Sequence, residues 1–235
     1  MIDPTSENHG RSEQSRYVTA AGHPMLTGLY DPFMALTMRE GSWRPVLRAS
    51  LLADLPEGGK IVDVGCGTGT LSIDLANSDS DIEVVGIDGD PDALTRAQEK
   101  PGAQRVSWVR GFAGELPLEN GSADSLVMTL LLHHLEPDEK QQALTEAHRV
   151  LRPGGSLHIA DWGRPRGLFA IRFLALRILD GFPNTRDHAE GRLTDFIEKA
   201  AFDRARCYRR LPTVWGTLEL IYAHRPFDGG EAIPN

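Results

Sequence analysis

A glycine-rich turn between an apolar strand and a helix constrains this chain more than any other feature. Residues 61–64 form a short apolar run that predicts a buried strand, and the sequence Gly-Cys-Gly-Thr-Gly follows it directly at 65–69. Glycines at alternate positions allow a tight turn and let the backbone approach a bound molecule, which side chains would block. A helix is expected at 70–77. The pattern predicts a nucleotide-type ligand at the end of the strand.

Strand and helix patterns alternate along the rest of the chain. We expect strands at 60–64, 82–87, 105–109, 125–130, 156–160, 205–211 and 217–224, and helices at 70–77, 91–99, 138–150 and 194–200. A turn at Pro153-Gly154-Gly155 is expected before the fifth strand. Such alternation predicts an α/β fold of the Rossmann-like, doubly wound type, with a mostly parallel sheet covered by helices on both faces.

The chain divides into three parts by composition. Residues 1–16 are polar and are expected to form a flexible leader. Residues 17–58 are expected to form a helical N-terminal cap; its apolar spacing from Tyr30 to Leu52 is interrupted at Gly41-Ser42 and by Pro45 near the next helix start. Residues 59–235 then form the ligand-binding domain, in which 163–195 is expected to be a helical lid insertion.

Residues 168–179 are mainly apolar, with Arg172 and Arg177 inserted. Three interpretations remain open: a lid over an apolar substrate, a surface that touches anionic lipid, or a core helix whose arginines extend to solvent. The composition does not distinguish them.

Two carboxylates flank the glycine turn. Asp88 ends the second expected strand, nineteen residues beyond Gly69, where a carboxylate can accept both hydroxyls of a ribose. Asp63 lies just before the turn, where it suits a ligand with an ammonium group and would repel a pyrophosphate. The third glycine also comes one position earlier than in the dinucleotide pattern. These features disfavour a nicotinamide dinucleotide.

Net charge and cysteine content narrow the expected partners and cellular compartment. The formal net charge is −8, which argues against nucleic acid as a partner because phosphate binding needs a basic face. Cys66 and Cys207 are the two cysteines, far apart in the chain, so a reducing cytoplasm is expected. The sequence has no uninterrupted run of about 18 apolar residues, so no membrane-spanning helix is predicted, although peripheral contact with a membrane stays open. The sequence does not define the oligomeric state.

In these motifs the chain resembles the class I S-adenosylmethionine (SAM)-dependent methyltransferases. The resemblance covers residues 59–162 and rests on four ordered stretches: 62–69, 84–88, 111–135 and 151–155. It is similar to the small-molecule branch that includes the ubiquinone/menaquinone-biosynthesis C-methyltransferases. The resemblance implies a seven-stranded sheet whose last strand inserts antiparallel.

The resemblance also implies how SAM would be held. Gly65, Gly67 and Gly69 would line its methionyl and ribose portions together with the backbone of Cys66, Asp63 would face the amino-acid end, and Asp88 the ribose hydroxyls. Gly89 and Leu130, which follow the second strand and end the fourth, are expected to contact the cofactor as well.

The chain departs from the family at the adenine contact. The family commonly has Gly-Asp-Ala where this chain has Gly111-Phe112-Ala113, and Phe112 cannot accept the hydrogen bond that the aspartate would. Phe112 either packs against the adenine, with the N–H of Ala113 serving a ring nitrogen, or simply fills core.

Four residues are candidates for substrate contact or for removal of a proton: His133, His134, Asp161 and Tyr30. His133 and His134 follow the fourth strand, where the crevice of an α/β sheet opens, and Asp161 ends the fifth. Asp161 contacts substrate or caps a loop, and at least one histidine is expected to pack at a helix start. No cysteine or acidic cluster accompanies the histidines at ligand spacing, so no metal is predicted.

The sequence therefore predicts an enzyme that moves a methyl group from SAM to a small, apolar organic acceptor without a metal. Two alternatives remain: a SAM-binding module without catalysis, which the departure at Phe112 keeps open, and an NAD-linked oxidoreductase, which the glycine spacing disfavours.

Overall fold

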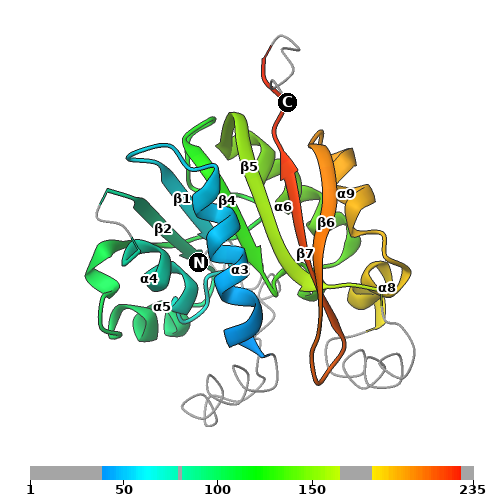
Figure 1. The fold of residues 1–235 in the computed structure, drawn as a ribbon, viewed down its shortest axis with the longest axis horizontal. Coiled ribbons are helices and arrows are strands. Elements are labelled where there is room, and N and C mark those ends of the chain that lie inside the picture. Colours follow the sequence, from blue (N-terminus) through cyan, green and yellow to red (C-terminus); the bar gives the residue numbers. More distant parts are fainter. Residues whose placement is uncertain (1–38, 79–80, 165–181, 229–235) are drawn as a thin grey trace, which may run out of the picture.

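A seven-stranded sheet organises residues 39–78, 81–164 and 182–228, which are the parts of the chain that the computed structural model describes (Figure 1). The strands are β1 (Lys60–Val64), β2 (Glu83–Asp88), β3 (Val106–Arg110), β4 (Ala123–Thr129), β5 (Leu151–Trp162), β6 (Asp203–Pro212) and β7 (Thr217–His224). Their order is β3-β2-β1-β4-β5-β7-β6. The doubly wound order and the Rossmann-like fold predicted from the sequence are confirmed.

Strand direction sets where the site can form. β1 to β5 pair in parallel, and β7 runs antiparallel to both of its neighbours, β5 and β6. The antiparallel last strand that the resemblance implies is therefore present. Val64 is in register with Ile87, and Thr129 with Ala160, so β1, β2, β4 and β5 end at one edge of the sheet. In doubly wound folds, ligands bind at that carboxyl edge.

Helices cover both faces of the sheet (Figure 1). They are α3 (Glu40–Ala53), α4 (Thr70–Ala76), α5 (Pro91–Gln98), α6 (Pro137–Val150), α8 (Phe182–Glu190) and α9 (Leu193–Lys199), with short 3-10 turns η2 (Ala103–Arg105) and η3 (Leu132–His134). One core packs α3 and α4 on the sheet, with Leu47 and Leu75 fully buried. The other packs α6 and α9, with Leu144 and Ile197 fully buried. Burial of such side chains is the main favourable contribution to the fold.

The predicted break in the N-terminal cap is wrong. Gly41, Ser42 and Pro45 all lie inside α3, which begins at Glu40 after Arg39 in the left-handed conformation. The helix is held to the sheet by its buried face, Trp43, Leu47 and Leu51. Tertiary packing therefore outweighs the low helix propensity of glycine and proline.

The predicted turn at Pro153-Gly154-Gly155 is also wrong. The segment continues β5, and its backbone pairs with the chain after β7: Gly154 N–H donates to Arg225 O, and Arg225 N–H to Gly155 O, each over 2.9 Å. Gly154 takes a positive φ of 78°, and the register between β4 and β5 shifts here. The glycines thus form a bulge within a strand.

Helix α8 lies within 163–195, the stretch for which the sequence analysis expects a helical insertion. Its buried side chains are polar, Thr185, Asp187 and His188, so no apolar stripe marks it in the sequence. The expected helix at 194–200 is confirmed as α9.

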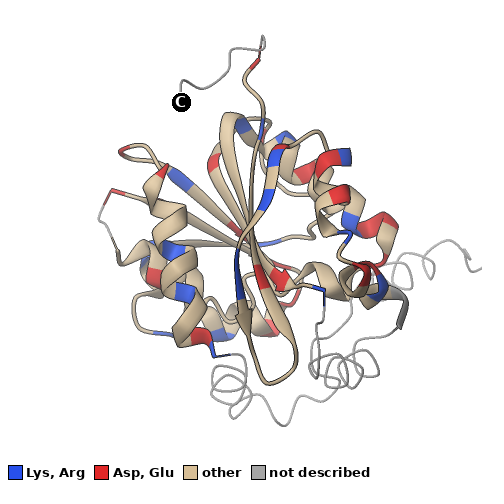
Figure 2. Cartoon of the chain, turned by 45° about the vertical axis from the view of Figure 1, so that its right-hand side comes forward, with Lys and Arg blue, Asp and Glu red and all other residues tan. Residues whose placement is uncertain are grey.

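Exposed arginines follow the edge strand β6, where Arg204, Arg206, Arg209 and Arg210 give the basic bands seen in Figure 2. Charges on an edge strand oppose pairing with another chain.

Within the described ranges, no helix is long and apolar enough to cross a membrane. The leader at 1–16, Tyr30 and the whole apolar stretch 168–179 lie outside the described residues, so the expectations for them stay predictions.

Candidate functional site

The glycine turn lies at the carboxyl edge between β1 and β2. Gly65, Gly67 and Gly69 take φ values of 72°, 54° and 71°, which side chains rarely adopt. A Cβ on Gly65 would meet Leu131, whereas a Cβ on Gly67 would meet nothing within 4 Å. Gly67 therefore borders open space at the sheet edge.

Most N–H groups of the turn are already engaged. Gly65 N–H and Cys66 N–H both donate to Ile87 O, over 2.8 and 3.1 Å, and Gly67 N–H donates to Asp88 Oδ2 over 2.7 Å. The turn is thus fixed on β2 by its own backbone, and the glycines serve its shape more than they present donors. Burial, and then the nearby Asp63 and Asp88, raises the pKa of the Cys66 thiol far above its usual range. The thiol is therefore not reactive.

Asp63, the next-to-last residue of β1, is almost completely buried, with 1% of its surface exposed. Its Oδ2 accepts a hydrogen bond from Ser72 Oγ over 2.6 Å, but its Oδ1 has no partner among the described residues. Burial raises the pKa of Asp63 to about 6, although the Ser72 hydrogen bond and the charge of Arg44 lower it. A buried carboxylate oxygen without a donor is unusual and indicates a bound cation or N–H group.

Arg44 is a site residue that sequence reasoning missed. It lies on α3, close enough to Asp63 for its charge to act on that carboxyl, and it pairs with Glu40 over 2.9 Å. Its Nε is buried and has no acceptor in the described structure. Among the described residues, Asp63 Oδ1 lacks a donor and Arg44 Nε lacks an acceptor, and these two groups suit the ammonium and the carboxylate of an amino acid. No sequence spacing links α3 to the turn, so nothing in the pattern could have found Arg44.

Asp88 ends β2, as predicted, and holds the loop around it. Its Oδ1 accepts from Asp90 N–H over 2.8 Å, and its Oδ2 accepts from Gly67. Burial raises the pKa of Asp88, and the hydrogen bonds from the backbone of Asp90 and Gly67 oppose that rise. Each oxygen has lone pairs for a second donor, so ribose hydroxyls remain compatible with this geometry.

Phe112 lies beside the Asp88 loop and not within either core. A Cβ on Gly89 would come within 2.8 Å of the Phe112 ring, and Phe112 is only half-buried. Ala113 next to it packs against the core on the α6 side. The interpretation that Phe112 fills core is therefore disfavoured by its position, which leaves its ring at the rim of the loop.

Leu130 directly follows β4 and adopts a strained backbone. Its φ is 52°, unusual for a residue with a Cβ, and its N–H donates to Ala160 O over 2.8 Å. Such strain clusters at functional sites. Its neighbour Leu131, which was not predicted, packs against the glycine turn through Gly65.

Asp161 and His133 form a buried pair at the ends of β5 and β4. Asp161 Oδ1 is 2.8 Å from His133 Nδ1 and accepts from Trp162 N–H over 2.7 Å, while Oδ2 accepts from Leu132 N–H over 2.9 Å. Burial alone would raise the pKa of Asp161, but His133, His188 and these hydrogen bonds hold it well below its usual range. Because the carboxylate is ionised, it accepts a hydrogen bond from Nδ1–H of His133. Asp161 thus both caps η3 and orients a histidine.

His134 stacks against this pair, with 3.9 Å between its ring centroid and that of His133. Burial, and then the charge of His133, lowers the pKa of His134 to about 3, so its ring is neutral near pH 7. The structure therefore brings His133, His134 and Asp161 together. The fourth candidate, Tyr30, is outside the described residues.

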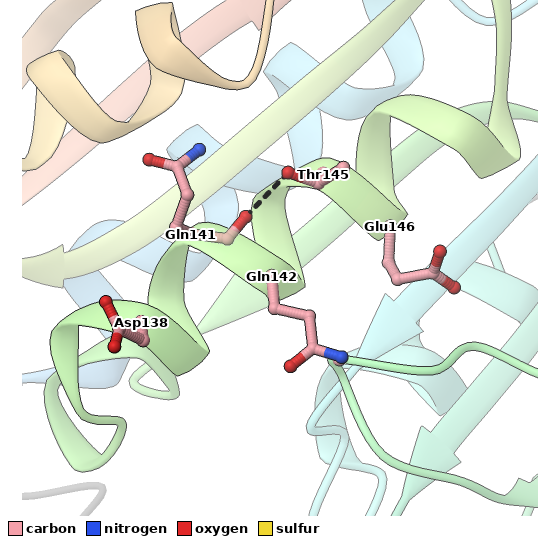
Figure 3. Close-up of a pocket in the computed structure, with 6 residues that line it drawn as sticks. Asp138, Gln141, Gln142, Thr145 and Glu146 are labelled. Carbon is pink, nitrogen blue, oxygen red and sulfur yellow. Dashed lines mark hydrogen bonds between the residues drawn. The ribbon is translucent and has the colours of Figure 1, made fainter.

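A shallow hollow on the outer side of α6 is separate from this edge (Figure 3). Two of its polar side chains already have partners: Thr145 Oγ1 donates to Gln141 O, and Glu146 pairs with Arg149. It offers no buried unpartnered group, in contrast to Asp63, and we do not place the site there.

The comparisons with known proteins agree with this geometry. A family model described as a methyltransferase domain matches residues 61–155. A demethylmenaquinone methyltransferase of Tropheryma whipplei is 31% identical over 208 residues, which cover 83% of this chain and 84% of that protein. An uncharacterised methyltransferase of Synechocystis is 37% identical over 108 residues, 46% of this chain and 49% of that protein.

The fold is shared with a solved SAM-dependent methyltransferase of Methanosarcina mazei, at a TM-score of 0.61 and 24% identity, covering 75% of this chain and 96% of that one. The chain spans about half the length of the first curated relatives that it matches.

Proposed function

Because the chain belongs to the SAM-dependent methyltransferase family, we propose that it transfers a methyl group from SAM to a small organic acceptor. The observation that carries the proposal is the Oδ1 of buried Asp63 at the carboxyl edge of the sheet, which has no partner among the residues that the structure describes. A methionyl ammonium supplies the donor that this oxygen lacks, and the nearby Nε of Arg44 suits the methionyl carboxylate.

Residues along the same edge complete the proposed cofactor site. Asp88 would accept the ribose hydroxyls, and the open space above Gly67 admits the ligand without a clash. Phe112 at the loop rim would pack against the adenine, with Gly89, Ala113 and Leu130 around it. Bound SAM supplies an activated methyl group on a sulfonium, so the protein has to position the acceptor and exclude water.

His133 is the proposed general base. Its Nδ1 is held by Asp161, and Nε2 is the atom that would take a proton from an acceptor hydroxyl as the oxygen or a conjugated carbon attacks the methyl group. Asp161 positions His133 and stabilises the imidazolium that results. Transfer of the proton to the buried His133 fits an acceptor that must be deprotonated to react.

The proposed acceptor is small and mainly apolar. The ring of Trp162, a residue only 2% exposed, lies edge-on to that of His133 with 6.1 Å between the centroids. The Tropheryma relative is named as a demethylmenaquinone methyltransferase. The lid role of 163–195 stays part of this proposal. A cytoplasmic location is proposed as well, supported by Cys66 and Cys207, which are both free thiols.

Thermal unfolding with added ligands tests the cofactor assignment. SAM is expected to raise the unfolding temperature in a concentration-dependent manner, whereas NAD is expected to leave it unchanged. Protection by NAD and not by SAM would instead favour the oxidoreductase.

Turnover distinguishes the enzyme from a binding module. Incubation with methyl-labelled SAM and a panel of phenols and hydroquinones is expected to give a labelled product. SAM binding without transfer to any acceptor of the panel would favour the module that has lost catalysis.

A further inference from the structure

The hairpin between β6 and β7 extends beyond the carboxyl edge of the sheet, as Figure 1 shows. Leu211 and Leu218 face each other across the hairpin, and Leu218 is in register with Trp162, the last residue of β5. The hairpin tip, residues 213–216, therefore lies past the end of β5. It shares this edge with the glycine turn and with Asp161, so a partner that contacts the tip comes close to the proposed site.

Hydrogen bonds of one buried side chain fix the shape of the hairpin tip. Thr213 is 4% exposed, and its N–H donates to Gly216 O over 2.8 Å. Its Oγ1 also donates to Gly216 O, over 2.9 Å, and accepts from the N–H groups of Trp215 and Gly216, over 3.2 and 3.1 Å. A turn held by such hydrogen bonds presents its outward side chains in a fixed arrangement.

The hairpin tip presents apolar side chains. Val214 is 45% exposed, and Val214 and Phe227 are the two exposed large apolar residues among those that the structure describes. Trp215 is half-buried and packs partly against the core under α3. Tryptophan is enriched where a protein meets the headgroup region of a bilayer, because its ring is apolar and its N–H is polar. The tip therefore has the side-chain chemistry of an interfacial contact.

Exposed arginines lie next to the hairpin tip. Arg39 Nη1, at the start of α3, donates to Pro212 O over 3.3 Å, which places this guanidinium beside the tip. Arg209 and Arg210 are exposed on the last part of β6, within the basic bands of Figure 2. Arg210 pairs with Glu219 over 2.8 Å, whereas no ion pair joins Arg39 or Arg209 to an acidic side chain of the described ranges. The chain as a whole carries a net charge of −8, so this positive end is a local feature.

We propose that the hairpin tip docks on an anionic lipid bilayer, with Val214 and Trp215 in the interface and Arg39 and Arg209 against lipid phosphates. A bilayer of this kind matches both parts of the surface, because apolar side chains enter the boundary of the acyl chains while arginines bind the headgroups. A second copy of the chain fits less well, since it would bring like charges together. Docking would turn the carboxyl edge of the sheet toward the bilayer, where apolar compounds dissolve. The inference goes beyond the proposed methyl transfer and does not depend on it.

Co-sedimentation of the full chain with lipid vesicles tests this. Binding is expected to vesicles of phosphatidylglycerol mixed with phosphatidylcholine, to be much weaker with phosphatidylcholine alone, and to fall as salt screens the charges. Arg209→Glu should weaken binding by about fivefold or more, the contribution of one arginine near an anionic surface. Val214→Asp should weaken it by about tenfold or more, because it removes apolar contact and adds a repelled charge.

Two matched controls place the contact at the tip. Arg204→Glu makes the same change of charge on β6, but at the opposite end of that strand. Phe227→Asp replaces the other exposed apolar residue, whose ring lies over Gly154 near the start of β5. Both variants are expected to bind the mixed vesicles as the wild type does, and thermal unfolding shows whether each variant keeps its fold.

Several results would overturn the proposal. They are no binding of the wild type to the mixed vesicles, equal binding to phosphatidylcholine alone, and an equal loss of binding in Arg204→Glu and Arg209→Glu. A dimer in vesicle-free solution that Val214→Asp dissociates would show that a second copy covers the tip instead. Because the assay contains neither SAM nor a methyl acceptor, its failure leaves the proposed function untouched, and absence of methyl transfer leaves this inference untouched.

Discussion

The clearest consequence of the buried Asp63 is a pH dependence of SAM binding that one substitution removes. In the free protein the pKa of Asp63 is about 6 because burial disfavours its charge. A bound ammonium needs the charged carboxylate, so binding must expel the proton from every molecule that holds one. Asp63→Asn removes both the charge and this proton.

The size of the effect follows from the pKa. At pH 6 about half of the free molecules carry the proton, so binding should release about half a proton, and almost none at pH 8. Between pH 7 and pH 5 the dissociation constant for SAM should rise about tenfold, since each unit below the pKa costs about 1.4 kcal/mol. Asp63→Asn should weaken binding at pH 7 by roughly 1.5–3 kcal/mol, the range of hydrogen bonds to charged groups.

The same shift has a consequence for stability. The folded pKa of about 6 lies above the unfolded value of 3.8, so the folded state keeps the proton to higher pH. The stabilisation is therefore complete below about pH 4 and is lost as the pH rises through about 6. Without ligand at pH 7, Asp63→Asn should not destabilise the protein and should remove this loss.

Calorimetry measures the pH dependence of SAM binding and the accompanying proton release directly. Titration of SAM in two buffers with different ionisation enthalpies gives the number of protons released, at pH 5, 6, 7 and 8. A dissociation constant that does not change from pH 7 to pH 5, or a pH dependence that persists in Asp63→Asn, would refute the reasoning.

Five other substitutions test separate parts of the account. Asp88→Ala should weaken SAM binding by roughly 2–3 kcal/mol in calorimetry, the scale of its charge-assisted hydrogen bonds, and unchanged affinity would refute the ribose assignment. Gly67→Ala should lower the free energy of unfolding by about 1–2 kcal/mol because the φ of Gly67 is 54°, and its new methyl group should also lower the affinity for SAM. Gly69→Ala should destabilise the fold far more in denaturant unfolding, because its Cβ would clash with the indole ring of Trp108. Lys140→Met should lower the free energy of unfolding by about 3 kcal/mol, because it removes the positive charge that pairs with the buried carboxylate of Asp187. Adding Asp187→Asn to this variant should restore part of the lost stability. Equal stability of the wild type and Lys140→Met would contradict the buried pair.

The sheet and the glycine turn could be predicted because their signals are local. A buried parallel strand such as β1 is mainly apolar, and the turn after it needs glycine for its positive φ angles. Asp88 could be placed because a strand end and a turn define its position. These features depend on neighbouring residues in the chain.

What the sequence did not reveal depends on contacts between distant segments. Arg44 reaches Asp63 only because α3 packs over the sheet, and α8 buries polar residues whose partners are on other elements. The bulge at Gly154 forms because Arg225, far along the chain, pairs with it. The link between His133 and Asp161 likewise follows from the parallel pairing of β4 and β5, although both residues were candidates from the sequence.

The central claim is methyl transfer from SAM at this edge of the sheet, with His133 as the base. The most direct test is the rate at which label from methyl-labelled SAM enters 1,4-dihydroxynaphthalene, compared between the wild type and His133→Gln. The account predicts transfer by the wild type, a rate lower by about 100-fold in the variant, and unchanged SAM affinity. Equal rates in the two proteins, or no label in the acceptor with the wild type, would contradict it.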